Sequence, residues 1–247
     1  MADDTITLLW LANSDDVGDF TPIEGRAYTL VAKALEAELG RKVEVVVRSV
    51  WPAPELPEII GRWMEKYRPD LVLFKVNSFW YLYRSVPLQL QRRFGWFGKA
   101  ASSAGKAAAR RRWISERWAF HAVRGLLLRT VGGASYFTVA EVVATAEVCT
   151  RRMLRHEDVG IVLHPTIDRW TSNPVKQKQG HDAMKAFAAS VHVTYLGADP
   201  FDPADWPPKD FYTGRDRLHS NEEANQWIAS RQAEALLEAW KRSHPGE

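Results

Sequence analysis

The sequence predicts an α/β protein with a doubly wound parallel sheet of five strands and a helical insertion. Two observations carry this prediction. Short apolar runs alternate with segments of helical periodicity before residue 84 and again after residue 156. Runs that are apolar throughout are typical of strands buried on both faces, as in parallel sheets that helices cover. Between the third and fourth runs lie about 80 residues, far more than a simple crossover needs.

The alternation begins with residues 6–13 (ITLLWLAN), which are too short for a typical helix and are bounded by polar residues. This pattern indicates a buried strand. Gly18 and Pro22 interrupt the chain before Ala, Leu and Val recur at helical spacing over 24–39, and Gly40 ends that helix. By the same reasoning we expect a strand, a helix and a strand at 43–47, 56–67 and 71–76.

The alternation resumes in the last third of the chain. VGIVL at 159–163 and VHVTYL at 191–196 predict two more strands, and helical patterns cover 177–189 and 221–242. Because parallel strands are joined by right-handed crossovers, five such strands favour a flavodoxin-like sheet.

The surplus residues between the third and fourth strands predict an inserted part. Helical patterns at 98–129 and 137–155 flank the Gly132-Gly133 pair. We therefore expect two parts, an α/β core formed by 1–84 and 156–247 and a helical cap or lid at 85–155.

The insertion is strongly basic. From Arg84 to Arg155 the chain carries 14 Lys or Arg and 3 Asp or Glu, whereas the remainder carries 19 and 27. An arginine recurs every seven residues along one predicted helical face, at Arg110, Arg117 and Arg124. An apolar stripe runs beside it, formed by Ile114, Trp118, Ala122 and Leu126. Two further tryptophans, Trp96 and Trp113, lie nearby in the sequence.

Two interpretations of this basic insertion stay open. It is either a cap packed on the core with its arginines in water, or a lid that meets an anionic membrane surface or guides an anionic substrate. Basic residues with tryptophans also suit single-stranded nucleic acid. No recognisable RNA or DNA motif is present, so no nucleic-acid partner is expected.

Other classes of protein are disfavoured by what the sequence lacks. An acidic start and apolar runs interrupted by Lys and Arg predict a cytoplasmic protein without a membrane span. The single cysteine, Cys149, permits no internal disulfide and is expected to be a small buried residue. Zinc-type Cys/His spacing and glycine-rich nucleotide motifs are missing, so neither a metal nor a cofactor is expected.

Polar residues follow the predicted strands at the edge where open α/β sheets bind ligands. Ser14 follows the first strand and Asn77 the third, and a loop after the fifth strand holds Asp216 and His219. A serine hydroxyl becomes a nucleophile when a histidine takes its proton and an acid orients that histidine. These residues supply that set, with helix-cap and turn roles as the alternatives for Ser14 and Asn77.

Three short motifs contain these residues: Ala12-Asn13-Ser14 with Gly18 four residues on, Lys75-Val76-Asn77-Ser78, and Asp216-x-x-His219-Ser220-Asn221. Over 1–84 and 156–247 the chain resembles the SGNH/GDSL-like serine hydrolases, a family of esterases and lipases. The corresponding family blocks read Gly-Asp-Ser-x-x-x-Gly, Gly-x-Asn-Asp, and Asp-x-x-His followed by a small or polar residue and Asn.

The resemblance implies a role for each residue. Ser14 would be the nucleophile, His219 its base and Asp216 the orienting acid, while Ser14 N–H and the Asn77 amide would form an oxyanion hole. The first and third blocks lack their first glycine and their aspartate. The second block lacks the glycine that supplies another donor, because loop 48–54 contains none. Loss of one such donor typically costs about 10²–10³ in rate.

The activity that this resemblance implies is hydrolysis of a small-molecule or lipid-like acyl ester through an acyl-enzyme on Ser14. An acyltransferase with the same triad stays open, as does a catalytically lost, flavodoxin-like protein that binds membrane surfaces or ligands. Asp15 and Asp16 suggest a Mg²⁺-dependent phosphoryl hydrolase as a further alternative.

Substrate contacts are expected from three more residues near the strand ends, His164, Trp51 and Trp80. The alternative for His164 is a core histidine bonded to a loop carbonyl.

Overall fold

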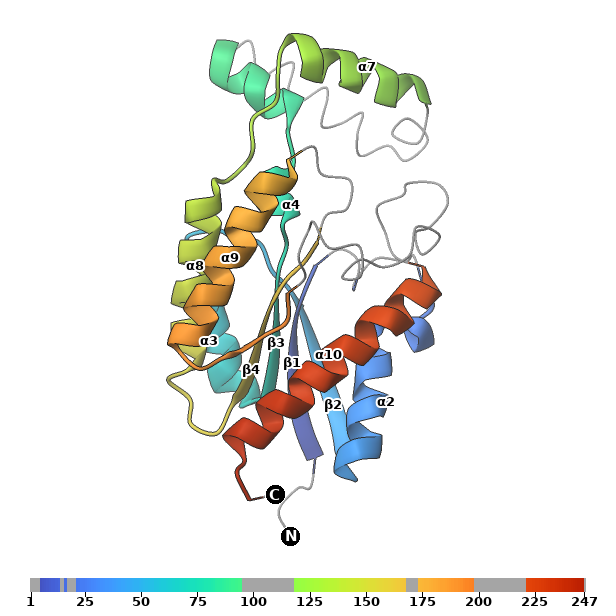
Figure 1. The fold of residues 1–247 in the computed structure, drawn as a ribbon, viewed down its shortest axis with the longest axis vertical. Coiled ribbons are helices and arrows are strands. Elements are labelled where there is room, and N and C mark those ends of the chain that lie inside the picture. Colours follow the sequence, from blue (N-terminus) through green and yellow to red (C-terminus); the bar gives the residue numbers. More distant parts are fainter. Residues whose placement is uncertain are drawn as a thin grey trace. The chain divides into compact units, whose positions relative to one another are not determined.

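The computed structural model describes residues 5–13, 16, 21–94, 118–167, 173–197 and 221–246. Within these residues five parallel strands form one sheet (Figure 1). They are β1 (Thr5–Ala12), β2 (Lys42–Ser49), β3 (Leu71–Val76), β4 (Gly160–Pro165) and β5 (Thr194–Tyr195). Their order in the sheet is β2-β1-β3-β4-β5, the flavodoxin-like order, which confirms the predicted fold class.

The register of the central strands brings their carboxyl ends to one edge. Leu11 of β1 pairs with Phe74 of β3, and Lys75 of β3 pairs with His164 of β4. Because all the pairings are parallel, the residues that follow β1, β3 and β4 emerge beside one another.

Burial explains why these segments form strands. Every residue of β3 and β4 is buried, and so are the last five residues of β1. A segment with both faces in the core has no need for polar alternation, which accounts for the continuous apolar runs in the sequence. The core includes Ile6, Leu8, Trp10, Leu71, Leu73, Val162, Leu236 and Trp240.

Helices cover both faces of the sheet (Figure 1). On one face α2 (Ala27–Leu39) packs against α10 (Glu222–Ser243). On the other face α8 (Val139–Met153) contacts both α3 (Leu56–Tyr67) and α9 (Pro174–Ser190).

Local capping fixes where two of these helices begin. The side chain of Asn173 accepts a hydrogen bond from the backbone N–H of Lys176 at 3.0 Å, so α9 begins at Pro174, before the expected residue 177. The side chain of Asn221 accepts from the N–H of Ala224 at 2.9 Å, which starts α10.

Two other boundaries differ from the sequence expectation. The helix expected at 24–39 begins at Ala27, because Ile23–Gly25 form a short 3-10 helix, η1. The strand expected at 191–196 is reduced to Thr194–Tyr195, since it pairs with β4 over only two residues.

The chain divides into two compact units, residues 1–78 with 139–247 and residues 79–138. The sequence analysis placed the divisions at residues 84/85 and 155/156. In the structure α8 belongs to the sheet-bearing unit, because it packs against α3 and α9.

The second unit contains α4 (Phe79–Leu82), a helical stretch at 86–94 and α7 (Trp118–Thr130). Backbone hydrogen bonds join Ser85 and Ala134, and α7 ends just before the Gly132-Gly133 pair, where Gly132 has φ +84°. The described residues of this unit include no Asp or Glu.

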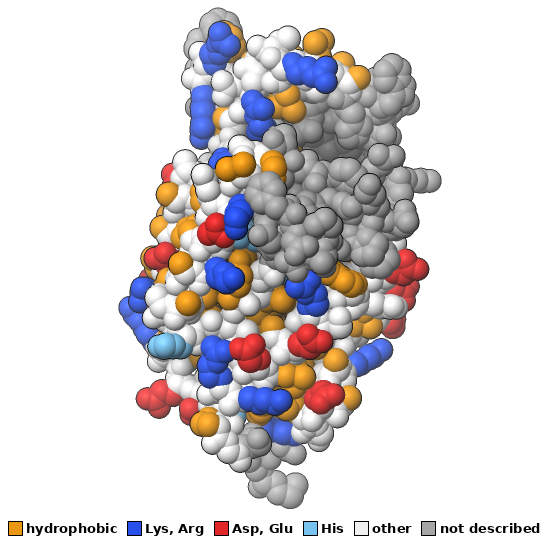
Figure 2. Space-filling view, viewed as in Figure 1, with side chains coloured by type: hydrophobic (Ala, Val, Ile, Leu, Met, Phe, Trp, Pro, Cys, Tyr) orange, Lys and Arg blue, Asp and Glu red, His pale blue; other side chains and the backbone are white. Residues whose placement is uncertain are grey.

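The sheet-bearing unit has a mixed surface. Lys and Arg side chains lie among Asp and Glu side chains over its visible face (Figure 2). In the described part of the chain, no helix has the length and apolar character required to span a membrane.

Candidate active site

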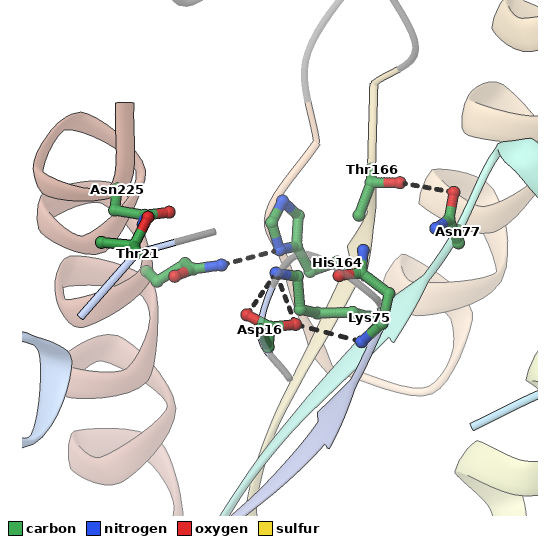
Figure 3. Close-up of polar contacts among 9 residues, drawn as sticks. Asp16, Thr21, Lys75, Asn77, His164, Thr166 and Asn225 are labelled. Carbon is green, nitrogen blue, oxygen red and sulfur yellow. Dashed lines mark hydrogen bonds and ion pairs between the residues drawn. The ribbon is translucent and has the colours of Figure 1, made fainter. Parts of the chain in front are cut away.

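Polar side chains gather where β1, β3 and β4 end (Figure 3). Asp16 follows β1, Lys75 and Asn77 lie at the end of β3, and His164 and Thr166 lie at the end of β4. This is the edge at which the sequence predicted a site.

Asp16 and Lys75 form a buried ion pair. Nζ of Lys75 lies 2.9 Å from both carboxylate oxygens of Asp16. Lys75 is 4% exposed and Asp16 is 2% exposed. The same ammonium lies 5.7 Å from the ring centroid of Trp10, within cation–π range. Taking a charge out of water costs several kcal/mol, about as much as a good partner returns, so each group needs the other.

Asp16 also closes the turn that follows β1. The backbone N–H of Asn13 donates to Oδ2 of Asp16 at 3.0 Å, and the N–H of Asp16 donates to the carbonyl oxygen of Asn13 at 3.3 Å. This reciprocal pair resembles a capping box, in which a side chain in the first helical turn bonds back to the cap residue. One carboxylate therefore holds both the turn and the end of β3.

Thr166 orients the side chain of Asn77. The N–H of Ser78 donates to Oγ1 of Thr166 at 3.3 Å, and the Thr166 hydroxyl donates to Oδ1 of Asn77 at 3.4 Å. The carbonyl of Thr166 accepts from the Ser78 hydroxyl and, at 3.3 Å, from Nε2 of His181. Oδ1 of Asn77 therefore faces the Thr166 hydroxyl, and Nδ2 is the donor atom of the same amide (Figure 3).

His164 is a core histidine, 6% exposed. Nε2 of Gln232 from α10 donates to its Nδ1 at 3.2 Å, so the ring accepts there, and the partner is an amide side chain and not a loop carbonyl. Burial holds the pKa of His164 well below its usual value, and the charges of Lys75, His181 and Arg231 lower this pKa further. His164 is thus a buried, hydrogen-bonded residue at the end of β4, and its contact with substrate stays a prediction.

The predicted triad lies outside the described residues. This holds for Ser14, Asp216 and His219, and also for Asp15. The described residues next to them in sequence are Asn13 and Asp16 on one side and Asn221 on the other.

Two tryptophans were expected to contact substrate. Trp51 lies two residues after β2 and is 44% exposed. Trp80 is buried in α4 and belongs to the second unit.

One contact joins the residues before η1 to the start of α10. Nδ2 of Asn225, in the first turn of α10, donates to Oγ1 of Thr21 at 3.2 Å, and both residues are buried. Thr21 follows Ser14 by seven positions, and Asn225 follows His219 by six. The chain just before η1 therefore contacts the first turn of α10 through these two side chains.

Solved structures share this fold at low sequence identity. The chain has the fold of known esterases. Esterase EstA from Pseudoalteromonas sp., in a structure inhibited by monoethylphosphonate, is 13% identical with a TM-score of 0.54, over 96% of this chain and 98% of that chain. TesA is 13% identical with a TM-score of 0.58, and the match covers 94% of this chain and 99% of that chain. A protein described as a GDSL-like lipase, from Parabacteroides merdae ATCC 43184, is 11% identical with a TM-score of 0.50, over 94% and 95%.

These structures confirm the resemblance to SGNH/GDSL-type hydrolases at the level of the fold. No protein-family model matches the sequence, and neither does any curated protein. The roles of individual residues therefore rest on this chain's own geometry.

Sequence reasoning missed several residues of this edge. Lys75 was quoted only as a departure from a family block, yet a lysine inside the apolar run LVLFKV signals a buried charge that needs a partner. Asp16 was considered as a metal ligand or as a solvated or helix-capping carboxylate, and not as the partner of a lysine. Thr166, His181 and Gln232 carry no local signal, because their partners come from other elements.

Proposed function

We propose that this chain is a serine-dependent ester hydrolase that forms an acyl-enzyme on Ser14. His219 is its general base and Asp216 orients His219. The Ser14 N–H and the Asn77 amide stabilise the oxyanion.

The position of Asn77 is the observation that carries this proposal. Leu11 and Phe74 are paired across β1 and β3, and Ser14 and Asn77 each follow one of these residues by three positions. Thr166 holds Oδ1 of Asn77, and Nδ2 is the atom of this amide that can donate. An amide donor fixed in advance beside a developing negative charge is what acyl transfer requires.

The flanks of the undescribed segments support the assignment of the base. Asn221 caps α10 two residues after His219, and Asn225 ties the same turn to Thr21. His219 therefore lies only two residues before a capped helix start that is also hydrogen-bonded to Thr21. The sheet edge also lies on a fold shared with esterases.

The proposed reaction runs in two balanced halves. His219 takes the Ser14 hydroxyl proton as the oxygen attacks the acyl carbonyl, and the same proton passes to the alcohol when the ester C–O bond breaks. Water then attacks the acyl-enzyme, giving its proton to His219. Ser14 recovers that proton as the carboxylic acid leaves.

The phosphoryl-transfer alternative is less compatible with the site. Both carboxylate oxygens of Asp16 already accept from the Lys75 ammonium at 2.9 Å. A divalent cation at Asp16 would have to displace this ammonium from a buried position, where like charges repel strongly.

For the substrate we propose an acyl ester with a lipid-like or anionic part. The basis is the basic second unit, whose described residues include no acidic side chain. Salt-sensitive co-sedimentation of the protein with anionic vesicles, compared with neutral vesicles, tests a membrane surface as the source of that anion.

The central experiment measures turnover of p-nitrophenyl esters together with labelling by a fluorophosphonate. We expect hydrolysis by the wild type, with the label on Ser14, and loss of both in Ser14→Ala. Ser230→Ala is the matched control, because Ser230 lies exposed on α10 and donates to the carbonyl of Trp227 in the same helix. This control should keep wild-type turnover.

Three results would change the proposal. A wild type that neither hydrolyses esters nor takes the label overturns it. A labelled Ser14 with transfer of the acyl group to an added alcohol in place of water makes the protein an acyltransferase. Mg²⁺-dependent phosphatase activity lost in Asp15→Asn would favour the phosphoryl hydrolase.

A further inference from the structure

Lys75 is an unusual residue for its place. It lies in β3, where all six residues are buried. A strand position in a fully covered sheet normally takes an apolar side chain. A buried ammonium at this position therefore indicates a specific partner and a specific use.

The partner of Lys75 places the ion pair between two segments that the proposed reaction uses. Asp16 follows Ser14 by two residues, and Lys75 precedes Asn77 by two residues. The Asp16 carboxylate binds the Lys75 ammonium with both oxygens and the Asn13 N–H with one of them. The pair is thus a cross-link from the turn after β1 to the end of β3.

We infer that the Asp16–Lys75 ion pair is a positioning device that fixes the nucleophile turn relative to the oxyanion amide. This inference rests on the proposed function. Neither side chain touches the reacting atoms. Asp16 acts through the backbone at Asn13, and Lys75 acts through Asp16.

An ion pair suits this task better than apolar packing does. Two oxygens at equal distance from one ammonium define both the direction and the separation of the groups they join. Apolar contacts tolerate sliding, and a displacement of about 1 Å at a reacting group costs about 10²-fold in rate. In some proteins buried ionic pairs add specificity of arrangement and little stability.

The test must separate positioning from folding. Removing one partner leaves an uncompensated buried charge, whereas replacing both partners by neutral groups is often tolerated. The informative variant is therefore the double substitution Asp16→Asn with Lys75→Met. Its asparagine still offers an oxygen to the Asn13 N–H, and its methionine fills the space of the lysine stem beside Trp10.

The matched control is Lys178→Met with Asp182→Asn. These residues form a second Lys–Asp ion pair, at 2.9 Å on the exposed surface of α9. The control loses the same two charges from an exposed ion pair within one helix. We expect its thermal unfolding, kcat and labelling rate to equal those of the wild type.

For the Asp16→Asn, Lys75→Met variant we expect cooperative unfolding near the wild-type temperature. The kcat and the rate of fluorophosphonate labelling at Ser14 should fall at least about tenfold, with KM changed less than about threefold. Amide hydrogen exchange in the peptide containing Asn13 and Asp16 should be faster than in the wild type. A purely structural role would leave kcat and exchange unchanged in a folded variant.

The outcomes separate the two proposals. A wild type that labels at Ser14, with a folded double variant that labels equally fast and exchanges equally slowly, overturns the inference and leaves the proposed function standing. A wild type that never labels overturns the proposed function, and with it the catalytic use of the pair.

Discussion

The hydroxyl of Thr166, one residue beyond β4, lies 3.4 Å from Oδ1 of Asn77, one residue beyond β3. A hydroxyl that accepts from the Ser78 N–H has its proton available for the Asn77 oxygen. This contact orients the amide from the residue that follows the neighbouring strand. Asn77 needs this help because an unrestrained amide presents oxygen and nitrogen equally well.

Thr166→Val removes the hydroxyl and keeps the shape of the side chain. We expect kcat for ester hydrolysis to fall about tenfold with little change in KM, less than the 10²–10³ that complete loss of an oxyanion donor costs. Steady-state kinetics with p-nitrophenyl acetate measure this. Thr166→Ser restores the hydroxyl and should restore most of kcat; an equally slow serine variant would contradict the orienting role.

His164→Asn should flatten the dependence of stability on pH below pH 6.5. Burial, together with the charges of Lys75, His181 and Arg231, places the pKa of His164 in the folded protein well below the unfolded value of 6.5. Just below pH 6.5 the unfolded chain therefore binds a proton at residue 164, whereas the folded chain does not. The stabilisation is complete above pH 6.5 and is lost as the pH falls toward the folded pKa, by up to about 1.4 kcal/mol per pH unit.

Urea unfolding of the wild type and of this variant at pH 5, 6, 7 and 8 measures the two slopes. The wild type should lose stability more steeply than the variant between pH 6.5 and 5. Identical slopes would mean that His164 takes up its proton in the folded state without cost.

The thiol of Cys149 should react with disulfide reagents only after unfolding. It is fully buried in α8, as expected from the sequence, and burial raises the pKa of this thiol to about 12. The reactive thiolate is therefore about a thousandfold scarcer than at the usual pKa of 9.0. Reaction with Ellman's reagent at pH 8 should be slow and should accelerate across the denaturant transition. Rapid reaction of the native protein would show that α8 opens locally.

Gly160→Ala should destabilise the protein by about 1–3 kcal/mol. A Cβ at this first residue of β4 would lie 2.7 Å from a methyl carbon of Leu71 and 3.0 Å from the backbone of Ala239 in α10. Backbone atoms cannot move aside as a flexible side chain can. Gly246→Ala is the control, because a Cβ there meets no atom within 4 Å, and its free energy of unfolding should match the wild type. Equal stability of both variants would show that α10 packs less closely than described.

Residues 71–76 and 56–67 show how much of the fold the sequence could predict. The strand and the helix expected there have the observed bounds, because burial on both faces leaves a continuous apolar run and a single buried stripe leaves helical periodicity. The length of β5 was overestimated, because an apolar run indicates burial and does not indicate how many residues pair with the neighbouring strand. The start of α10 followed from Asn221, a local cap.

The candidate site was predictable only in part. Asn77 could be chosen because it follows a strand, and Lys75 could have been noticed as a charge inside an apolar run. The identity of the partner of Lys75 was not accessible, because Asp16 lies 59 positions earlier in the chain. Thr166 bonds Asn77 across 89 positions for the same reason.

The sequence by itself determined the order of strands and helices, the parallel sheet and the edge at which a site forms. These follow from periodicity and caps, which act over a few residues. Tertiary structure alone decided that the Asp16 carboxylate holds Lys75, that Thr166 orients Asn77 and that Gln232 bonds a neutral His164. Hydrogen bonds and ion pairs depend on distances between side chains, and only the packed sheet and helices bring residues so far apart in the chain within 3–4 Å of each other.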